Sequence, residues 1–113
     1  MTIYIVQGNY TQEALAGMVA KPEDRALSVE PLIKAAGGKL LGYYVTYGEY
    51  DFLAVVDGGR SADNIMGALM AAGATGGVTN LRTTIGVTSK EAMKAMRAGK
   101  KLRAGFKPAG QPA

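Results

Sequence analysis

The sequence contains neither cysteine nor histidine in its 113 residues. Without cysteine the chain forms no disulfide and has no thiol nucleophile, and without either residue it lacks the usual ligands of structural zinc and of haem. Histidine is also the side chain that most often acts as acid or base near neutral pH. Any chemistry must therefore come from other polar side chains, from backbone amides or from a bound group, and we expect neither a metal site nor a cofactor.

Long apolar runs are also missing. No segment approaches the ~20 apolar residues that a membrane-spanning helix requires, and the first residues lack the basic start of a signal peptide. We therefore expect a cytoplasmic protein with no membrane partner. An apolar fraction of 48% with 19% charged residues is typical of a folded domain. A chain of this length builds one domain, and self-association would help it to complete its core.

Positive charge is concentrated at the C-terminal end. Residues 88–113 contain seven Lys or Arg and one acidic residue, whereas residues 1–87 contain six basic and eight acidic residues. Nucleic acid is therefore an unlikely partner for the body of the chain. The basic run from Lys90 to Lys107 includes one aromatic residue, Phe106. This pattern favours a solvated helix face, with docking on an acidic partner, RNA or a membrane surface as alternatives.

The first half of the chain alternates between strand and helix patterns. A β-branched and aromatic run predicts a strand over residues 2–9, and Thr11 is placed to cap a helix that ends at Lys21-Pro22. A second helical stretch ends at Gly37-Gly38, and Pro31 predicts a kink or a restart from Ser28.

The second half repeats the pattern. Two strands, 40–46 and 50–56, flank a short turn and form a hairpin. Ser61 is placed to cap a helix reaching about Ala72, and residues 78–87 form a fourth strand. Thr88 and Glu91 match a capping box that opens a helix through about Leu102.

The predicted order is β-α-β-β-α-β followed by a helix, which is the ferredoxin-like α+β arrangement with a four-stranded antiparallel sheet. We divide the chain into one domain, residues 1–103, and a flexible basic Gly-Pro tail, residues 104–113. Both helices of this fold cover the same sheet face. Both alternating sets of each strand contain large apolar residues, so the helix-free face is predicted to pack against a second copy, as a homodimer or a higher homo-oligomer.

The hairpin carries a family resemblance. The run Gly48-Glu49-Tyr50-Asp51, between an aromatic-rich strand and Leu53-Ala54-Val55-Val56, resembles the signature of the GYD domain family. The segments from Tyr4 to Thr11 and from Val87 to Met93 are similar to that family's opening and closing elements. The resemblance covers about residues 2–98. It implies a dimeric α/β barrel, in which two ferredoxin-like sheets face each other, and it does not select an activity.

Five of the eight aromatic residues lie within ten positions of the hairpin. In a dimer with facing sheets, some of them would line a cavity where a phenol offers an apolar wall and one hydrogen-bond donor. Packing within the sheet and the interface is the simpler interpretation. The ligand-binding tyrosines predicted from this cluster are Tyr43, Tyr44, Tyr47 and Tyr50.

Asp51 is the predicted catalytic residue, because a carboxylate at the start of an apolar strand would be partly desolvated and its pKa could rise toward that of a general base. Arg82, in the middle of the fourth strand, is its expected partner. Strand alternation places Asn80, Arg82 and Thr84 on one face, which would suit a polar lining, so Arg82 and Thr84 join the predicted ligand-binding set. The alternative is an edge strand that shows these residues to water. The alternative is a structural Asp51 that bonds to the adjacent turn.

Gly58-Gly59-Arg60-Ser61 at a helix start could hold an anion on free amides, but the run lacks the fuller phosphate-loop pattern and a plain turn is the simpler interpretation.

Three functions fit these features. The first is an oligomeric barrel protein that binds a small organic ligand, partly aromatic or carbonyl-containing, between facing sheets. The second is a cofactor-independent enzyme of proton-transfer, isomerase or monooxygenase type that uses Asp51 and a tyrosine. The third is an assembly or adaptor protein that uses its basic C-terminal helix. The sequence leaves open whether the chain is an enzyme, and the lack of histidine weighs modestly against the second function.

Overall fold

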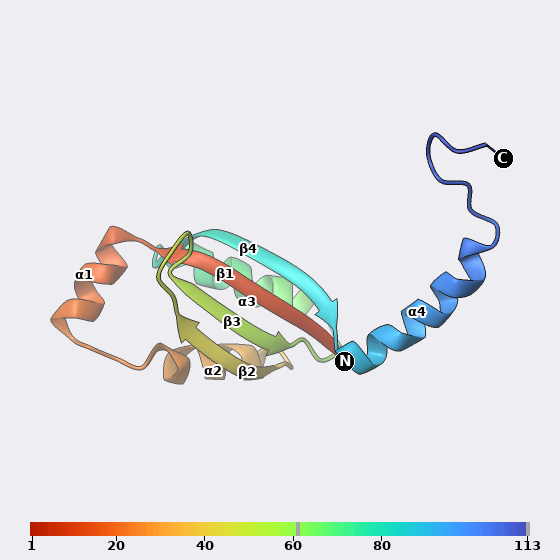
Figure 1. The fold of residues 1–113 in the computed structure, drawn as a ribbon. Coiled ribbons are helices and arrows are strands. Elements are labelled where there is room, and N and C mark those ends of the chain that lie inside the picture. The colour runs from red at the N-terminus through yellow and green to blue at the C-terminus, as the bar shows by residue number, and fades with distance from the viewer. Residues whose placement is uncertain (61, 113) are drawn as a thin grey trace.

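A computed structural model describes residues 1–60 and 62–112 of the chain. Its four strands form one antiparallel sheet in the order β2-β3-β1-β4. Helices connect some of these strands along the chain (Figure 1). This arrangement confirms the predicted ferredoxin-like α+β fold with an added C-terminal helix. The elements are β1 (Thr2–Tyr10), α1 (Gln12–Ala20), α2 (Arg25–Ala35), β2 (Lys39–Val45), β3 (Phe52–Asp57), α3 (Ala62–Ala74), β4 (Val78–Val87) and α4 (Ser89–Arg103).

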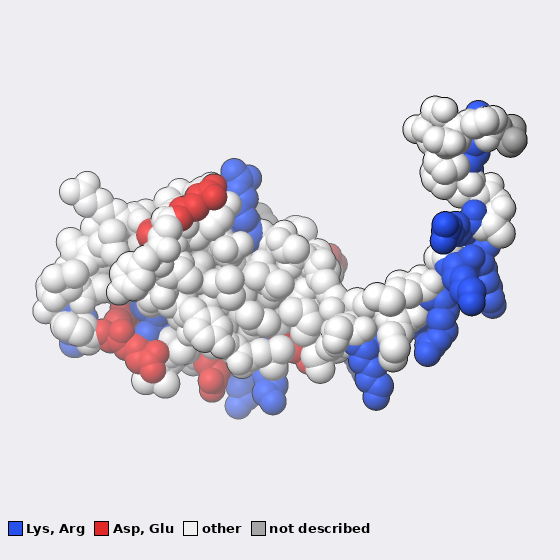
Figure 2. Space-filling model, viewed as in Figure 1, with Lys and Arg blue, Asp and Glu red and all other residues white. Residues whose placement is uncertain are grey.

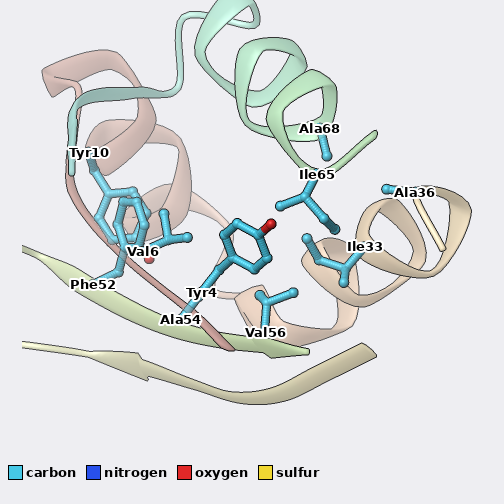
Figure 3. Packing of buried hydrophobic residues seen from close by; sticks show 10 residues of the cluster. All are labelled: Tyr4, Val6, Tyr10, Ile33, Ala36, Phe52, Ala54, Val56, Ile65 and Ala68. Carbon is cyan, nitrogen blue, oxygen red and sulfur yellow. The ribbon is translucent and has the colours of Figure 1, made fainter. Parts of the chain in front are cut away.

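The core lies between one face of the sheet and helices α2 and α3. Side chains in β1 and β3 alternate between buried and half-buried, as expected for strands with one face covered. Figure 3 shows the two helices contributing from above while the two central strands contribute from below. The buried cluster consists of Tyr4, Val6, Tyr10, Ile33, Ala36, Phe52, Ala54, Val56, Ile65 and Ala68.

The other face of the sheet carries no helix. Ile5 lies opposite Val55 there, and Gln7 lies opposite Leu53. These four side chains are only half-buried in the single chain. The face is therefore apolar at its centre and open.

Two predicted boundaries in the first three-quarters of the chain are wrong. Helix α2 begins at Arg25 instead of restarting at Ser28, because the Asp24 carboxylate caps it by accepting a hydrogen bond from the Ala26 amide at 3.0 Å. Strand β3 begins at Phe52 instead of residue 50, because Asp51 belongs to the turn. The predicted helix cap at Ser61 lies outside the described residues.

Helix α4 points away from the rest of the molecule (Figure 1). The predicted capping box between Thr88 and Glu91 is confirmed, and Glu91 also pairs with the amino terminus of Met1. None of the α4 residues is buried. Within residues 1–60 and 62–112, no helix is both long enough and apolar enough to cross a membrane.

Candidate functional site

A cavity of about 420 Å³ lies between the sheet and the helices α1, α2 and α3. Its floor is the helix-covered face of β1 and β3, and its walls come from the apolar inner sides of the helices. The wall residues include Ala14, Met18, Val29, Leu32 and Leu69. A chamber with such a lining suits the apolar part of a small molecule.

Three aromatic rings from three neighbouring strands line one end of this cavity. The Phe52 ring lies between those of Tyr10 and Tyr43, with centroids 5.2 Å and 5.8 Å away. The hydroxyl groups of Tyr10 and Tyr43 form a hydrogen bond with each other. A pair of phenols uses one hydrogen for its mutual bond, so one hydroxyl hydrogen is left to donate to a third group.

Charged side chains join this hydroxyl pair at the cavity wall. Arg25, the first residue of α2, and Glu23 both line the cavity, and they are joined by a long contact of 3.5 Å. Both side chains are partly exposed, so this ion pair contributes little stability. Arg25 is therefore able to exchange Glu23 for an anionic group inside the cavity.

The protonation state of Tyr43 follows from its surroundings. Burial raises the pKa of the Tyr43 phenol, its hydrogen bond with Tyr10 raises that pKa further, and the Arg25 guanidinium acts in the opposite direction. The net shift is upward, so Tyr43 keeps its proton near neutral pH. A protonated phenol has a hydrogen to donate, and either Tyr43 or Tyr10 is the donor in their mutual bond.

Asp51 lies at the turn before β3 and ties the hairpin to the end of β1. Its carboxylate accepts a hydrogen bond from the Tyr10 amide at 2.9 Å. Its own amide donates to the Gly8 carbonyl at 2.8 Å, and its carbonyl accepts from the Thr46 amide at 2.8 Å. Asp51 thereby holds the backbone of Tyr10, one member of the hydroxyl pair. This bonding differs from both earlier interpretations, since the carboxylate reaches β1 and not the Gly48-Glu49 turn.

The expected pairing of Asp51 with Arg82 is not formed. Among the residues that the structure describes, neither a salt bridge nor a hydrogen bond joins the two side chains. Arg82 lies opposite Gln7 on the helix-free face and is exposed, and Thr84 lies there opposite Ile5. Strand alternation explains why the two side chains do not meet. The Asp51 carboxylate bonds to the end of β1, whereas alternation turns the Arg82 side chain from the edge strand β4 to solvent.

The structure separates the four predicted tyrosines. Tyr43 alone lines the cavity. Tyr44 lies opposite Leu53 on the helix-free face, and Tyr47 is fully exposed in the turn. Tyr50 is half-buried in the same turn, where its carbonyl accepts a hydrogen bond from the Thr46 hydroxyl.

Sequence reasoning missed Tyr10 and Arg25. Tyr10 ends an alternation of buried positions that starts at Tyr4 and runs along β1, and this signal was present in the sequence. Arg25 gave no such signal, because it lies in a stretch that reads as a break between helices. Its place at the cavity depends on how α2 packs.

The glycine turn after β3 does not offer free amides. The Gly58 amide donates to the Thr2 carbonyl, and the Gly59 amide donates to the Asp57 carboxylate, each at 3.0 Å. A Cβ atom on Gly58 would lie 2.0 Å from the Tyr4 ring. This pair of glycines therefore serves close packing, which supports the plain-turn interpretation. In the described ranges, no group of three or more acidic side chains is placed to hold a metal ion.

The comparison with protein families identifies the family to which the hairpin and the elements around it belong. The model of the GYD domain matches residues 4–96, which include β1, the cavity, Asp51 and the start of α4. The chain belongs to the GYD domain family. The family resemblance noted in the hairpin is thus confirmed.

Comparisons with curated proteins and with solved structures give no information on the function of this GYD protein. None of the curated proteins resembles it closely enough to count as a match. A hypothetical protein from Pyrococcus horikoshii has 16% sequence identity and a TM-score of 0.47, covering 79% of this chain and 93% of its own. The protein FFRP-DM1 has 16% identity and a TM-score of 0.48, covering 77% of this chain and all of its own. These likenesses are too weak to carry an argument about function.

Replacing Asp51 tests its structural bond. Asp51→Ala removes the acceptor of the Tyr10 amide, and we expect a loss of about 1–3 kcal/mol in the free energy of unfolding. Asp51→Asn keeps a carbonyl oxygen at that place and should retain most of the stability. Urea denaturation measures both, with Asp63→Ala in the exposed first turn of α3 as the control. Wild-type stability in Asp51→Ala would contradict the structural role.

Alkaline titration tests the environment of Tyr43. Its pKa is raised in the folded protein, so between about pH 10 and that higher value the unfolded chain loses a proton that the folded chain keeps. The stabilising effect is thus complete below about pH 10 and is lost as the pH rises further. We expect unfolding free energy to fall less steeply above about pH 10 in Tyr43→Phe than in the wild type. Tyr47→Phe, at a fully exposed position, should match the wild type, and equal slopes in all three proteins would refute the assignment.

Proposed function

We propose that this GYD protein is a homo-oligomeric protein that binds a small organic molecule in the cavity beneath α1 and α2. One observation carries the proposal. The cavity combines an apolar chamber of about 420 Å³ with the Tyr10–Tyr43 hydroxyl pair and the Arg25 guanidinium. Its volume falls within the range of roughly 300–1,000 Å³ that small-molecule sites occupy.

The ligand chemistry follows from the lining. The apolar walls favour an aromatic or aliphatic body, and the free hydroxyl hydrogen favours a carbonyl or carboxylate oxygen at one end. Arg25 adds a second hydrogen-bond donor. Once its guanidinium leaves Glu23, it is able to bind a ligand carboxylate in a bidentate geometry. We therefore propose an aromatic or aliphatic carboxylate, or a related carbonyl compound, as the ligand class.

Binding is favoured over catalysis by the state of Asp51, the predicted catalytic residue, and of Tyr43, the one predicted tyrosine that lines the cavity. The Asp51 carboxylate is engaged by the Tyr10 amide, and its residue does not line the cavity. Tyr43 retains its proton, so neither group serves as a base toward a molecule in the cavity. The location of the cavity also differs from the expectation of a chamber between facing sheets, because this cavity lies on the helix-covered side.

Self-association belongs to the same proposal and uses the opposite side of the sheet. The half-buried Ile5, Leu53 and Val55 form an apolar centre on the helix-free face, and the exposed Tyr44 lies opposite Leu53. Burying this surface against a second copy would remove it from water at about 25 cal/mol per Å² of apolar area. The ligand cavity and the pairing surface are thus on opposite faces of one sheet.

A fluorescent carboxylate tests the cavity. We expect 2-naphthoate to bind the wild type, and naphthalene, which lacks the carboxylate, to bind more weakly. Gly17 lines the cavity and a side chain at its Cβ position meets open space, so Gly17→Leu should fill the chamber and weaken 2-naphthoate binding by about tenfold or more. Gly67→Leu is the matched control, since Gly67 also has open space, in α3 but away from the cavity. Equal titration curves for the three proteins would refute this site.

Sedimentation equilibrium tests the pairing surface. Val55→Lys places a charge at the centre of the helix-free face, and we expect it to raise the dissociation constant of the oligomer by about tenfold or more. Met66→Lys, at an exposed position on α3, is the control and should leave the constant unchanged. A monomeric wild type, or equal constants for both variants, would exclude pairing through this face.

A further inference from the structure

The chain exposes far more surface than a compact protein of its mass. Its accessible area is 8347 Å² at 11.7 kDa. A compact monomer of that mass exposes about 5,900 Å², so the excess is roughly 2,500 Å². The radius of gyration is 18.4 Å, against about 13 Å for a compact chain of this length. The chain is therefore extended, and much of its surface is not covered by its own packing.

Much of this excess comes from α4, which has two chemically distinct faces. Lys90, Lys94, Arg97 and Lys101 recur at intervals of four, three and four residues and form one basic stripe. Figure 2 shows Lys and Arg side chains along the projecting helix. The other side of the helix carries small and apolar residues together with Arg103, namely Ala92, Ala95, Met96, Gly99, Leu102 and Arg103.

The apolar side of α4 has no partner in the single chain. Met96 is 66% exposed, Leu102 is 74% exposed, and Phe106 beyond the helix is 72% exposed. An amphipathic helix normally buries such a stripe, because apolar area in contact with water is unfavourable. A cover for this helix must therefore be both apolar and acidic.

Helices α1 and α2 provide a surface of this kind. We call it the acceptor surface and define it by exposed residues of these helices and their connection, namely Glu13, Leu15, Val19, Glu23, Leu27 and Glu30, with Glu13 on the other side of α1 from Leu15. Val19 is 80% exposed and Leu27 is 72% exposed. Residues 12–35, which span both helices, contain four acidic and three basic side chains, so this region has a formal charge of −1 while α4 is positive.

A second exposed apolar surface matches α4 less well. Met66 and Met70 on α3 lie exposed, as do Ile85 and Val87 on β4. Asp63 is the acidic residue of α3, whose first turn it occupies. Charge complementarity therefore favours the acceptor surface.

Helix α4 points away from the acceptor surface of its own chain (Figure 1). In the β1–β4 pair, Tyr10 lies opposite Val78 and Thr2 lies opposite Val87. Helix α1 follows Tyr10 and α4 follows Val87, so the two helices leave from opposite ends of the sheet (Figure 1). The capping box of Thr88 and Glu91 fixes the start of α4 directly after β4.

We infer that α4 is an exchange arm that docks on the acceptor surface of a second copy of this chain. Its apolar face covers Leu15, Val19 and Leu27 of that copy, and its basic stripe lies beside the acidic side chains there. This contact is additional to pairing through the helix-free face, and it holds whether or not the cavity takes a ligand. The excess area exceeds the roughly 800 Å² per partner that a stable interface buries.

Disulfide trapping tests the arm directly, because the natural chain has no cysteine. Full-length Met96→Cys and full-length Leu27→Cys are mixed and oxidised gently, and the products are separated without reductant. We expect a covalent heterodimer. Because each variant has one cysteine, a disulfide between the two sites must join two chains. The control mixture pairs Met96→Cys with Met66→Cys, whose site is similarly exposed on the second surface. Equal or preferential trapping at Met66, or no heterodimer in either mixture, would overturn the inference.

Charge reversal provides an independent measurement on the intact chain. The triple variant Lys94→Glu, Arg97→Glu, Lys101→Glu should weaken self-association by about tenfold or more in sedimentation equilibrium. The variant Glu13→Lys, Glu23→Lys, Glu30→Lys should do the same, and an equimolar mixture of the two triple variants should recover association. Lys107→Glu, beyond the helix, should leave it unchanged. Failure of the mixture to recover would contradict arm exchange.

The two proposed contacts are distinguishable in this assay. Val55→Lys disrupts the helix-free face of the sheet and does not change α4. If this variant loses association through that face but still forms the disulfide between positions 96 and 27, arm exchange is supported independently of the sheet contact. An anionic surface is the competing cover for α4. Flotation of a monomeric wild type with vesicles containing phosphatidylserine, in the absence of disulfide trapping, would assign the helix to a membrane surface and overturn the proposal.

Discussion

Packing of α2 and α3 on one face of the two central strands is the interaction on which the rest of the structure depends. Tyr4, Val6 and Tyr10 of β1 lie beside Phe52, Ala54 and Val56 of β3, and together they meet Ile33 and Ile65 from the helices. Val56 and Ile65 are almost completely buried. Since a strand turns successive side chains to opposite faces, burying this set leaves the alternate set on the helix-free face. The same constraint therefore creates the core and the open surface.

The cavity arises where this packing is incomplete. Helix α1 buries none of its residues, and its inner side covers the end of the sheet only loosely. The aromatic rings of Tyr10, Phe52 and Tyr43 close the gap from below, and the phenols meet there because β1, β3 and β2 are adjacent. Asp51 contributes to the cavity indirectly, because its carboxylate accepts a hydrogen bond from the Tyr10 amide. The residue that names the hairpin motif thus supports the site without lining it.

A small chain with incomplete packing exposes apolar surface in several places, and the separate surfaces differ in chemistry. The helix-free face is apolar at its centre, α4 is apolar and basic, and α1–α2 is apolar and acidic. Each suits a different contact between copies, and the α1–α2 surface shares Glu23 with the cavity wall. Association would stabilise the fold by removing these surfaces from water, in addition to any role of the ligand.

Local pattern in the sequence determined the order of elements, the alternation in β1 and β3, the hairpin and the capping box of α4, because each depends on neighbours within a few positions. The start of α2 was missed because the Asp24 cap competed with the stronger signal of Pro31. The tertiary structure alone decided which tyrosine faces the cavity, that Asp51 bonds to Tyr10 and not to Arg82, and that Arg25 reaches the site. These outcomes depend on register between strands far apart in the chain and on the packing of a helix, and a one-residue change in register moves every side chain to the other face.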